Sequence, residues 1–336
     1  MKTCAILVCD NGLGHIYRTL LSAVEISKSS IKTTIYAPID KVKKFEDKIP
    51  DLKKLNITDF SSKTSLDEIK SGHYEPLELV KRLPDFKKYD YVISDNLIEI
   101  LLVREDAFLS AQFFWHDIFR SINQSYADFG DNLLSKYSPL IFGIDLFSMN
   151  YVKSQKNFVP TGMYRNPDIN IHGDNSLRSK VIITPGTTKH SFYKFESLIR
   201  KLANSVSSEI DYYIEPSLFK KNLPYFFKVA NFDDEMFKDS YACICRPGLG
   251  IISKLLEFEI LPFVIYEDGN LEMRHNLNVL KNNNLGFEYS NACHDSIIEY
   301  KNSRVLRKNF SRECQKINWN GSSIIADLFS SIQGCR

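Results

Sequence analysis

The sequence feature that most constrains the fold is a unit made of a short apolar run, a Gly-Leu-Gly turn and a helical pattern. It occurs once in each half of the chain. Apolar residues 3–9 lead into the first turn at residues 12–14, and residues 242–245 lead into the second at residues 248–250. A strand, a glycine turn and a helix in this order are typical of doubly wound α/β domains, which bind ligands beyond the carboxyl ends of parallel strands.

Further strand and helix patterns alternate along the chain. Strands are predicted at residues 33–37, 91–94, 112–115 and 146–149 in the first half, and at 180–184, 211–214, 226–229 and 263–266 in the second. Helices are predicted at residues 15–27, 97–107, 118–136, 192–206, 250–258 and 273–283. This alternation predicts sheets of parallel strands covered by helices.

A polar segment rich in Asn, Asp, Pro and Gly separates the two halves and is predicted to be a linker over residues 165–179. The sequence therefore predicts a first α/β domain over residues 1–164 and a second over residues 180–320. We expect the terminal residues 321–336 to form a helix that packs back on the first domain.

The composition is that of a globular protein. Of the 336 residues, 43% are hydrophobic and 25% are charged, which argues against a disordered or fibrous chain. The net charge of +2 gives no reason to expect a nucleic-acid partner. No apolar run approaches the roughly 18–20 residues of a membrane span, and the first run stops at Asp10, so a cytoplasmic protein is expected. The seven cysteines include no CxxC pair and are expected to be reduced and buried.

The first glycine turn carries two candidate functional side chains at the start of its helix. The amino end of a helix offers free N–H groups and a positive dipole, which favour an anionic ligand near Gly12 and Gly14. A neutral imidazole at His15 would suit a general base there. Arg18, one turn later, can pair with a carboxylate or a phosphate. The alternative is a purely structural turn with a solvated histidine.

Two aspartates follow predicted strands of the first half and should share the edge where His15 lies. Asp95 follows the strand of residues 91–94, and Asp117 follows that of residues 112–115. Either carboxylate could orient the imidazole or act as a base. The alternative is that each residue caps a helix.

The second glycine turn predicts a phosphate site. The amides of Gly248, Leu249 and Gly250 could approach a diphosphate, and Arg246 adds positive charge. The following helix supplies further candidates, which are Arg274, His275 and Asn278. A plain strand–turn–helix unit is the alternative.

A third candidate phosphate contact lies after the strand of residues 180–184. Gly186, Thr187 and Thr188 offer amides and hydroxyls there. The same residues could instead form a turn that caps the next helix.

The segment from Gly12 to Arg18 resembles the GxGHxxR loop of a branch of GT-B sugar-nucleotide enzymes. That branch includes the UDP-sugar hydrolase of pseudaminic acid synthesis, and the lipid II N-acetylglucosaminyltransferase is more distantly similar. The order Arg246-Pro247-Gly248, helix, Leu261-Pro262 and Asn278 resembles the donor half of the same superfamily. The resemblance implies two facing Rossmann-like domains with an interdomain cleft, a nucleotide-sugar in the second, an acceptor in the first and a catalytic His15.

The sequence departs from the family pattern at three positions near the nucleotide. Leu255 stands where the family has a ribose-binding Glu, and Glu259 stands where it has Gly. The family Gln falls on Arg274 or His275. The identity of the nucleotide base is therefore left open.

The resemblance implies a glycosyltransferase that moves a sugar from a nucleotide-sugar to an acceptor hydroxyl in cell-surface glycan synthesis, by direct displacement with inversion. Metal-ligand motifs are absent, and no cofactor is expected. The expected acceptor is a glycan or a lipid-linked molecule, with peripheral contact to the inner membrane face. Aromatic and basic residues 225–228 could touch a membrane or pack in a core strand. The alternative functions are nucleotide-sugar hydrolysis, with His15 activating water, and a binding module without turnover.

Overall fold

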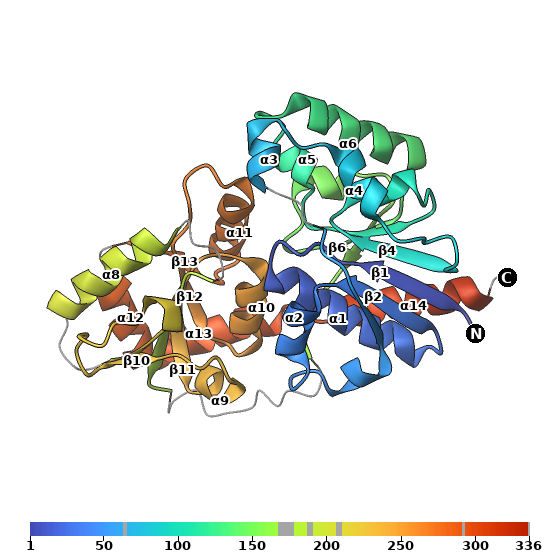
Figure 1. Ribbon diagram of the computed structural model, residues 1–336. Coiled ribbons are helices and arrows are strands. Elements are labelled where there is room, and N and C mark those ends of the chain that lie inside the picture. The colour runs from blue at the N-terminus through green and yellow to red at the C-terminus, as the bar shows by residue number, and fades with distance from the viewer. Residues whose placement is uncertain (63–65, 167–177, 187–190, 206–209, 291–292, 335–336) are drawn as a thin grey trace. The chain divides into compact units, whose positions relative to one another are not determined.

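The computed structural model describes residues 1–62, 66–166, 178–186, 191–205, 210–290 and 293–334. The chain forms two compact units (Figure 1). Unit 1 consists of residues 1–166 together with residues 318–336, and unit 2 consists of residues 167–317. The last segment of the chain therefore belongs to the first unit.

Unit 1 is built on a seven-stranded sheet with the order β3-β2-β1-β4-β5-β6-β7, in which neighbouring strands are parallel. The strands are β1 (Thr3–Leu7), β2 (Lys32–Ala37), β3 (Asn56–Asp59), β4 (Tyr91–Asp95), β5 (Phe108–Ser110), β6 (Ile141–Ile144) and β7 (Phe158–Thr161). The strand order reverses direction between β1 and β4. In such sheets the carboxyl ends of the two strands at this switch point border a ligand-binding crevice.

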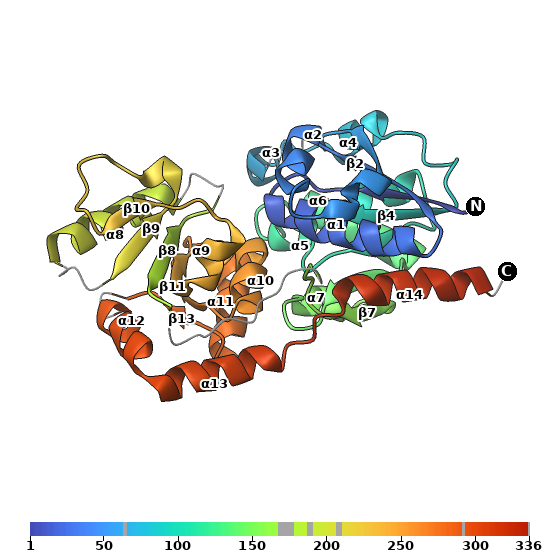
Figure 2. The ribbon, with the colours of Figure 1, turned by 90° about the horizontal axis from the view of Figure 1, so that it is seen from below.

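The helices of unit 1 cover this sheet. They are α1 (Leu13–Lys28), α2 (Ile39–Val42), α3 (Leu66–Ser71), α4 (Pro76–Arg82), α5 (Trp115–Ile118), α6 (Gln124–Tyr137), α7 (Asn150–Lys153) and α14 (Gly321–Gly334). Helix α1 buries Ile16, Leu20 and Ala23, whose three- and four-residue spacing places them on one face. Helix α14, red in Figure 2, packs against α1 and places the buried Phe329 against the rings of two strand residues.

Unit 2 has a six-stranded sheet with the order β10-β9-β8-β11-β12-β13, again with parallel neighbours. Its strands are β8 (Lys180–Thr184), β9 (Asp211–Ile214), β10 (Phe227–Val229), β11 (Ser240–Cys245), β12 (Leu261–Val264) and β13 (Phe287–Glu288). Its helices are α8 (Phe192–Ser205), α9 (Asp234–Lys238), α10 (Leu249–Glu257), α11 (Leu271–Asn282), α12 (Cys293–Asn302) and α13 (Arg304–Gln315). The switch point of this sheet lies between β8 and β11.

Arg178 fixes the start of β8. Its buried guanidinium donates hydrogen bonds to the carbonyl oxygens of Phe258 at 2.7 Å and Glu259 at 3.1 Å. Glu259 has φ 53°, in the left-handed region that glycine adopts at least cost, which explains why a glycine is suited to this turn. The carbonyls of a strained turn are thereby held by a cation from the neighbouring segment.

Three predictions in the first half are wrong. Residues 97–107 form a short 3-10 helix over Ile98–Leu102 in place of a long helix. The predicted strands at residues 112–115 and 146–149 are loop and helix segments that follow the true strands β5 and β6. The apolar side chains at residues 113–115 are buried, but they lie beyond the end of a three-residue strand. Short apolar runs report burial and do not distinguish a strand from the buried segment after it.

Two smaller expectations concern cysteines and membranes. Cys4, Cys9, Cys243, Cys245 and Cys314 are buried free thiols, in agreement with the prediction for the described cysteines. Within the described ranges, none of the helices combines the length and the apolar character that a membrane crossing requires.

Candidate functional site

The site of unit 1 lies at its switch point. Gly12 precedes α1 with an extended backbone and, as a glycine, has no side chain that could cap the helix. His15 is in the first turn of α1, which follows β1, and Asp95 is the last residue of β4. Because β1 and β4 are neighbours in a parallel sheet, these two residues meet at the same edge, although they are 80 positions apart.

His15, Arg18 and Asp95 form a hydrogen-bonded triad. The Asp95 Oδ2 lies 2.7 Å from the His15 Nδ1. The Asp95 Oδ1 accepts from the Arg18 Nη2 at 2.5 Å and from its Nε at 3.2 Å. Because an ionised carboxylate only accepts hydrogen bonds, the contact with Asp95 requires a proton on Nδ1. The Arg18 Nη2 also lies 2.9 Å from this nitrogen. In a neutral imidazole with its proton on Nδ1, Nε2 is the acceptor nitrogen, and none of the hydrogen bonds of the described residues uses it.

The Asp95 carboxyl is fully buried yet remains ionised. Burial by itself raises its pKa, but the positive charge of Arg18 and the hydrogen bonds from His15 and Arg18 outweigh burial and hold the pKa below its ordinary value. The side chain of His15 is 14% exposed, so one edge of the imidazole reaches the surface. The arrangement suits a general base whose orientation a buried carboxylate fixes.

Asp117 does not join this triad, which corrects one of the two proposed partners of His15. It lies in the short helix α5 and accepts from the Arg120 Nε at 3.3 Å. Arg120 also binds Asp131 through two hydrogen bonds of 2.8 and 2.9 Å. Burial raises the pKa of Asp117. The local pattern predicted a strand that ends at residue 115. Because residues 115–118 form helix α5, Asp117 does not directly follow a strand.

Three amide side chains follow β1, β4 and β5 at the same edge of the sheet. They belong to Asn11, Asn96 and Gln112. Asn96 and Gln112 are buried, and both amide atoms of each have no hydrogen-bond partner within the described residues; the same holds for Nδ2 of Asn11. Buried polar atoms in native proteins almost always have a protein, water or ligand partner. These amides therefore leave donors and acceptors for a buried water or a small polar ligand.

Unit 2 has its own site at the carboxyl ends of β8 and β11. The Arg246 backbone N–H donates to the Thr184 carbonyl at 3.3 Å, so the two strand ends are in contact. The Thr184 hydroxyl donates to Glu215 at 2.7 Å and accepts from the Gly186 N–H at 3.1 Å. Gly186 has φ 71°, which glycine adopts readily. Two predicted members of this site, Thr187 and Thr188, lie outside the described residues.

The second Gly-Leu-Gly turn opens α10 as the sequence suggested. Gly248 precedes the helix, and a Cβ placed on it would meet no atom within 4 Å. Leu249 and Gly250 are the first two helical residues, so their N–H groups lie among those that have no partner within the helix. The half-buried Arg246 lies beside this turn, 3.3 Å from Glu267, and burial lowers its pKa.

Helix α11 contributes a buried asparagine that contacts this turn. Asn276 is buried, and its Nδ2 donates to the Pro247 carbonyl at 2.9 Å, which holds the turn in place. Arg274 and Asn278 are exposed, and His275 is half-buried. The signal for Asn276 was present in the sequence, because residue 276 shares the apolar face of α11 with its buried leucines.

Leu255 and Glu257, near the end of α10, are both closed to solvent. Leu255 is fully buried in the core of unit 2, so its side chain is not available to a ligand. Glu257 is also buried, and its carboxylate lies 3.7 Å from the Lys254 ammonium.

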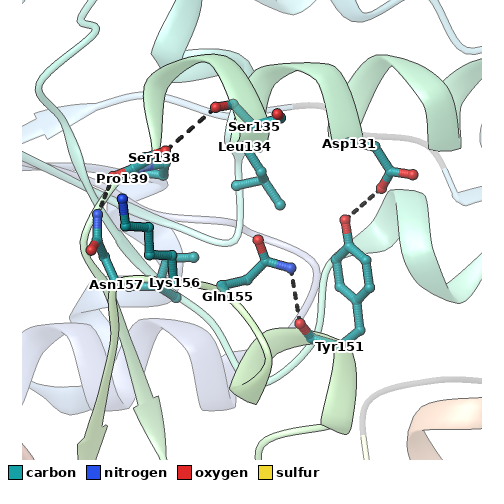
Figure 3. Close-up of a pocket in the computed structure, with 10 residues that line it drawn as sticks. Asp131, Leu134, Ser135, Ser138, Pro139, Tyr151, Gln155, Lys156 and Asn157 are labelled. Carbon is teal, nitrogen blue, oxygen red and sulfur yellow. Dashed lines mark hydrogen bonds between the residues drawn. The ribbon is translucent and has the colours of Figure 1, made fainter.

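A cavity of about 320 Å³ lies elsewhere in unit 1, between α6, α7 and the start of β6 (Figure 3). None of the predicted site residues lines it. Figure 3 shows the Tyr151 hydroxyl directed at Asp131, to which it donates at 2.5 Å. The described residues contain no cluster of three His, Cys, Asp or Glu side chains that could hold a metal ion.

The sequence matches no protein-family model. It also matches no curated protein sequence. Comparison with solved structures, by contrast, gives matches along the whole chain.

The matching structures include the following three glycosyltransferases. The glycotransferase of kitacinnamycin matches with a TM-score of 0.67 and 10% identity over 98% of each chain. The calicheamicin glycosyltransferase CalG4 matches with a TM-score of 0.65 and 11% identity, covering 99% of this chain and 98% of that one. The spinosyn rhamnosyltransferase SpnG, complexed with thymidine diphosphate, matches with a TM-score of 0.61 and 12% identity, covering 98% and 100%. With its two parallel sheets, the chain has the GT-B fold of these glycosyltransferases.

Proposed function

We propose that this protein is a glycosyltransferase that moves a sugar from a nucleotide-sugar to an acceptor hydroxyl. The observation that carries the proposal is the contact of His15 with the buried, ionised Asp95, which leaves Nε2 free to remove the acceptor proton. Proton removal makes the hydroxyl oxygen a stronger nucleophile toward the anomeric carbon of the donor. The sugar–oxygen bond to the diphosphate breaks as the new bond forms, so the anomeric configuration inverts.

Unit 2 would hold the donor diphosphate at the start of α10. The open space at Gly248 permits close approach of phosphate oxygens, and the first N–H groups of α10 lack helical partners. Arg246 and these N–H groups would stabilise the negative charge of the departing diphosphate without a metal ion or another cofactor. Full activity after dialysis against a chelator is the expected result.

Unit 1 would bind the acceptor near His15. The unpartnered amides of Asn96 and Gln112 can each donate and accept, which suits an acceptor rich in hydroxyl groups. A glycan or a lipid-linked sugar in cell-surface glycan synthesis, reached from the cytoplasm, has this chemistry.

Substitution of His15 and of the two candidate aspartates tests the proposal. We expect His15→Ala to lower kcat by roughly 10²- to 10⁴-fold, because the general base is lost. Asp95→Asn should also lower kcat, whereas the matched variant Asp117→Asn should retain most activity. Transfer is measured with a panel of nucleotide-sugars and hydroxylated acceptors, and donor binding is followed as a rise in Tm.

Two results would contradict the assignment of the base. Full turnover by His15→Ala would exclude His15. A loss in Asp117→Asn equal to that in Asp95→Asn, with both variants folded, would remove the special role of the contact with Asp95.

Hydrolysis of the nucleotide-sugar is the second candidate, because a partly exposed imidazole at His15 can activate water as well as an acceptor hydroxyl. Incubation of the enzyme and donor without an acceptor separates the two reactions. Sugar release as fast as transfer would favour the hydrolase, and release much slower than transfer would favour the transferase. Donor binding with neither reaction would indicate a binding module.

A further inference from the structure

Helix α13 at the edge of unit 2 has an unusual concentration of positive charge. Residues 304–316 carry five basic side chains and one acidic one, a net charge of +4, whereas the whole chain carries +2. The remainder of the protein is therefore net negative. Figure 2 shows α13 as a peripheral helix that follows α12.

The helix is anchored by a narrow inner face. Phe310 and Cys314 are buried, and the Phe310 ring lies 6.1 Å from that of Tyr300 in α12. The hydroxyl of Ser303 accepts from the Leu306 N–H at 3.2 Å and caps the amino end. The helix is therefore a fixed part of unit 2, and the face opposite Phe310 and Cys314 points away from the core of that unit.

The opposite face combines cations with an apolar side chain. At 3.6 residues per turn, Arg304, Lys308 and Arg312 fall within an arc of about 80°, and Val305 falls about 20° beyond it. All four are exposed, Val305 to 67%. The acidic residue of the helix, Glu313, falls about 80° beyond Val305. Its carboxylate lies 2.5 Å from the Lys316 ammonium and 3.6 Å from the Arg312 Nε.

We infer that this face of α13 binds the surface of an anionic lipid bilayer. Cationic side chains near such a surface each contribute about 1 kcal/mol, and an exposed apolar residue beside them can enter the headgroup boundary. A nucleic-acid backbone would satisfy the cations but would gain nothing from an exposed Val305. Residues 225–228 are the other segment considered for membrane contact. Phe226 and Phe227 of that segment are buried and do not reach a bilayer.

Membrane binding by α13 does not depend on the glycosyl transfer proposed above. It would hold the enzyme at the surface where a lipid-linked acceptor is found. Because the contact is electrostatic, binding should weaken as the salt concentration rises.

Sedimentation with vesicles of phosphatidylglycerol and phosphatidylcholine tests the inference with the whole protein. We expect wild type to bind anionic vesicles and not vesicles of pure phosphatidylcholine. The triple variant Arg304→Gln, Lys308→Gln, Arg312→Gln should bind roughly a hundredfold more weakly. The control Lys87→Gln, Lys156→Gln, Lys221→Gln removes the same charge from exposed sites elsewhere and should bind within a few-fold of wild type.

A second variant separates lipid from other polyanions. Val305→Ser should weaken vesicle binding several-fold while leaving Tm unchanged, because the side chain is exposed. Equal binding by the two triple variants, or no binding of wild type to anionic vesicles, would overturn the inference. Wild type could instead bind an RNA duplex at the same salt concentration, and Val305→Ser could change neither RNA binding nor vesicle binding. That result would assign the face to nucleic acid. Transfer in vesicle-free solution, measured on the same variants, tests the proposed chemistry separately.

Discussion

At the scale of single residues, the structure gives His15 and His116 of unit 1 opposite environments. His15 is partly exposed and contacts an ionised carboxylate. His116 is fully buried, its Nε2 lies 3.2 Å from the Tyr151 hydroxyl, and its Nδ1 has no partner among the described residues. Burial lowers the pKa of His116 to about 4, so this imidazole is neutral in the folded protein at neutral pH.

His116 predicts a loss of stability in acid. Between pH 6.5 and 4 the unfolded chain takes up a proton on this side chain while the folded chain does not, so the free energy of unfolding falls as the pH falls. The expected loss from this residue is about 3 kcal/mol. Urea unfolding of wild type and His116→Gln at several pH values measures it, because the variant should lose less stability over the same interval. His73→Gln, at an exposed histidine, is the matched control. Identical pH profiles of wild type and His116→Gln would contradict the prediction.

At the scale of secondary-structure elements, the glycines at helix starts and within helices have different roles. A methyl group on Gly248 would enter open space at the amino end of α10. A methyl group on Gly130, within α6, would lie 2.2 Å from the His116 ring. The first glycine leaves room for a ligand, and the second leaves room for a side chain of the core.

Substitution of these two glycines predicts opposite outcomes. Gly248→Ala should lower the free energy of unfolding by no more than about 1 kcal/mol, because φ is −70° and only the helix start changes. It should raise the Kd for nucleoside diphosphates about tenfold or more, since the phosphates lose close approach. Gly130→Ala should lower stability by about 1–3 kcal/mol through overpacking and leave that Kd unchanged. Calorimetric titration and urea unfolding give the two quantities, and unchanged affinity in Gly248→Ala would move the diphosphate away from this turn.

The elements of unit 2 were more predictable from the sequence than those of unit 1. The strands β8 and β9 have the predicted bounds, and α8, α10 and α11 lie within two residues of theirs. In unit 1, β3 and β7 were not predicted, because each has four residues with at most one fully buried side chain. Such strands form by pairing with a neighbour, and their own composition does not identify them.

At the scale of the whole molecule, the chain leaves unit 1, forms unit 2 and returns. Phe329 of α14 is fully buried in unit 1, with its ring 5.0 Å from that of Tyr91 and 4.9 Å from that of Phe108. The last helix therefore completes the core under β4 and β5, the strands beside the triad.

We predict that Phe329→Ala lowers the stability of unit 1 by about 3–5 kcal/mol through the cavity that it creates. Hydrogen exchange should accelerate in β1, β4 and β5 and remain unchanged in β8 and β11. The matched variant Phe258→Ala removes a buried ring from the core of unit 2 and should give the reverse pattern. Equal acceleration in both sheets after Phe329→Ala would show that the units do not unfold separately.

The sequence by itself determined the repeated strand–glycine–helix unit, the alternation of strands and helices and the position of His15 at a helix start. These features depend on local periodicity and on turns, which neighbouring residues specify. Only the tertiary structure decided that Asp95 and not Asp117 contacts His15, and that Asn276 holds the second turn. Both contacts depend on which strands lie side by side and where each strand ends, and residues 80 positions apart meet only after the sheet has formed.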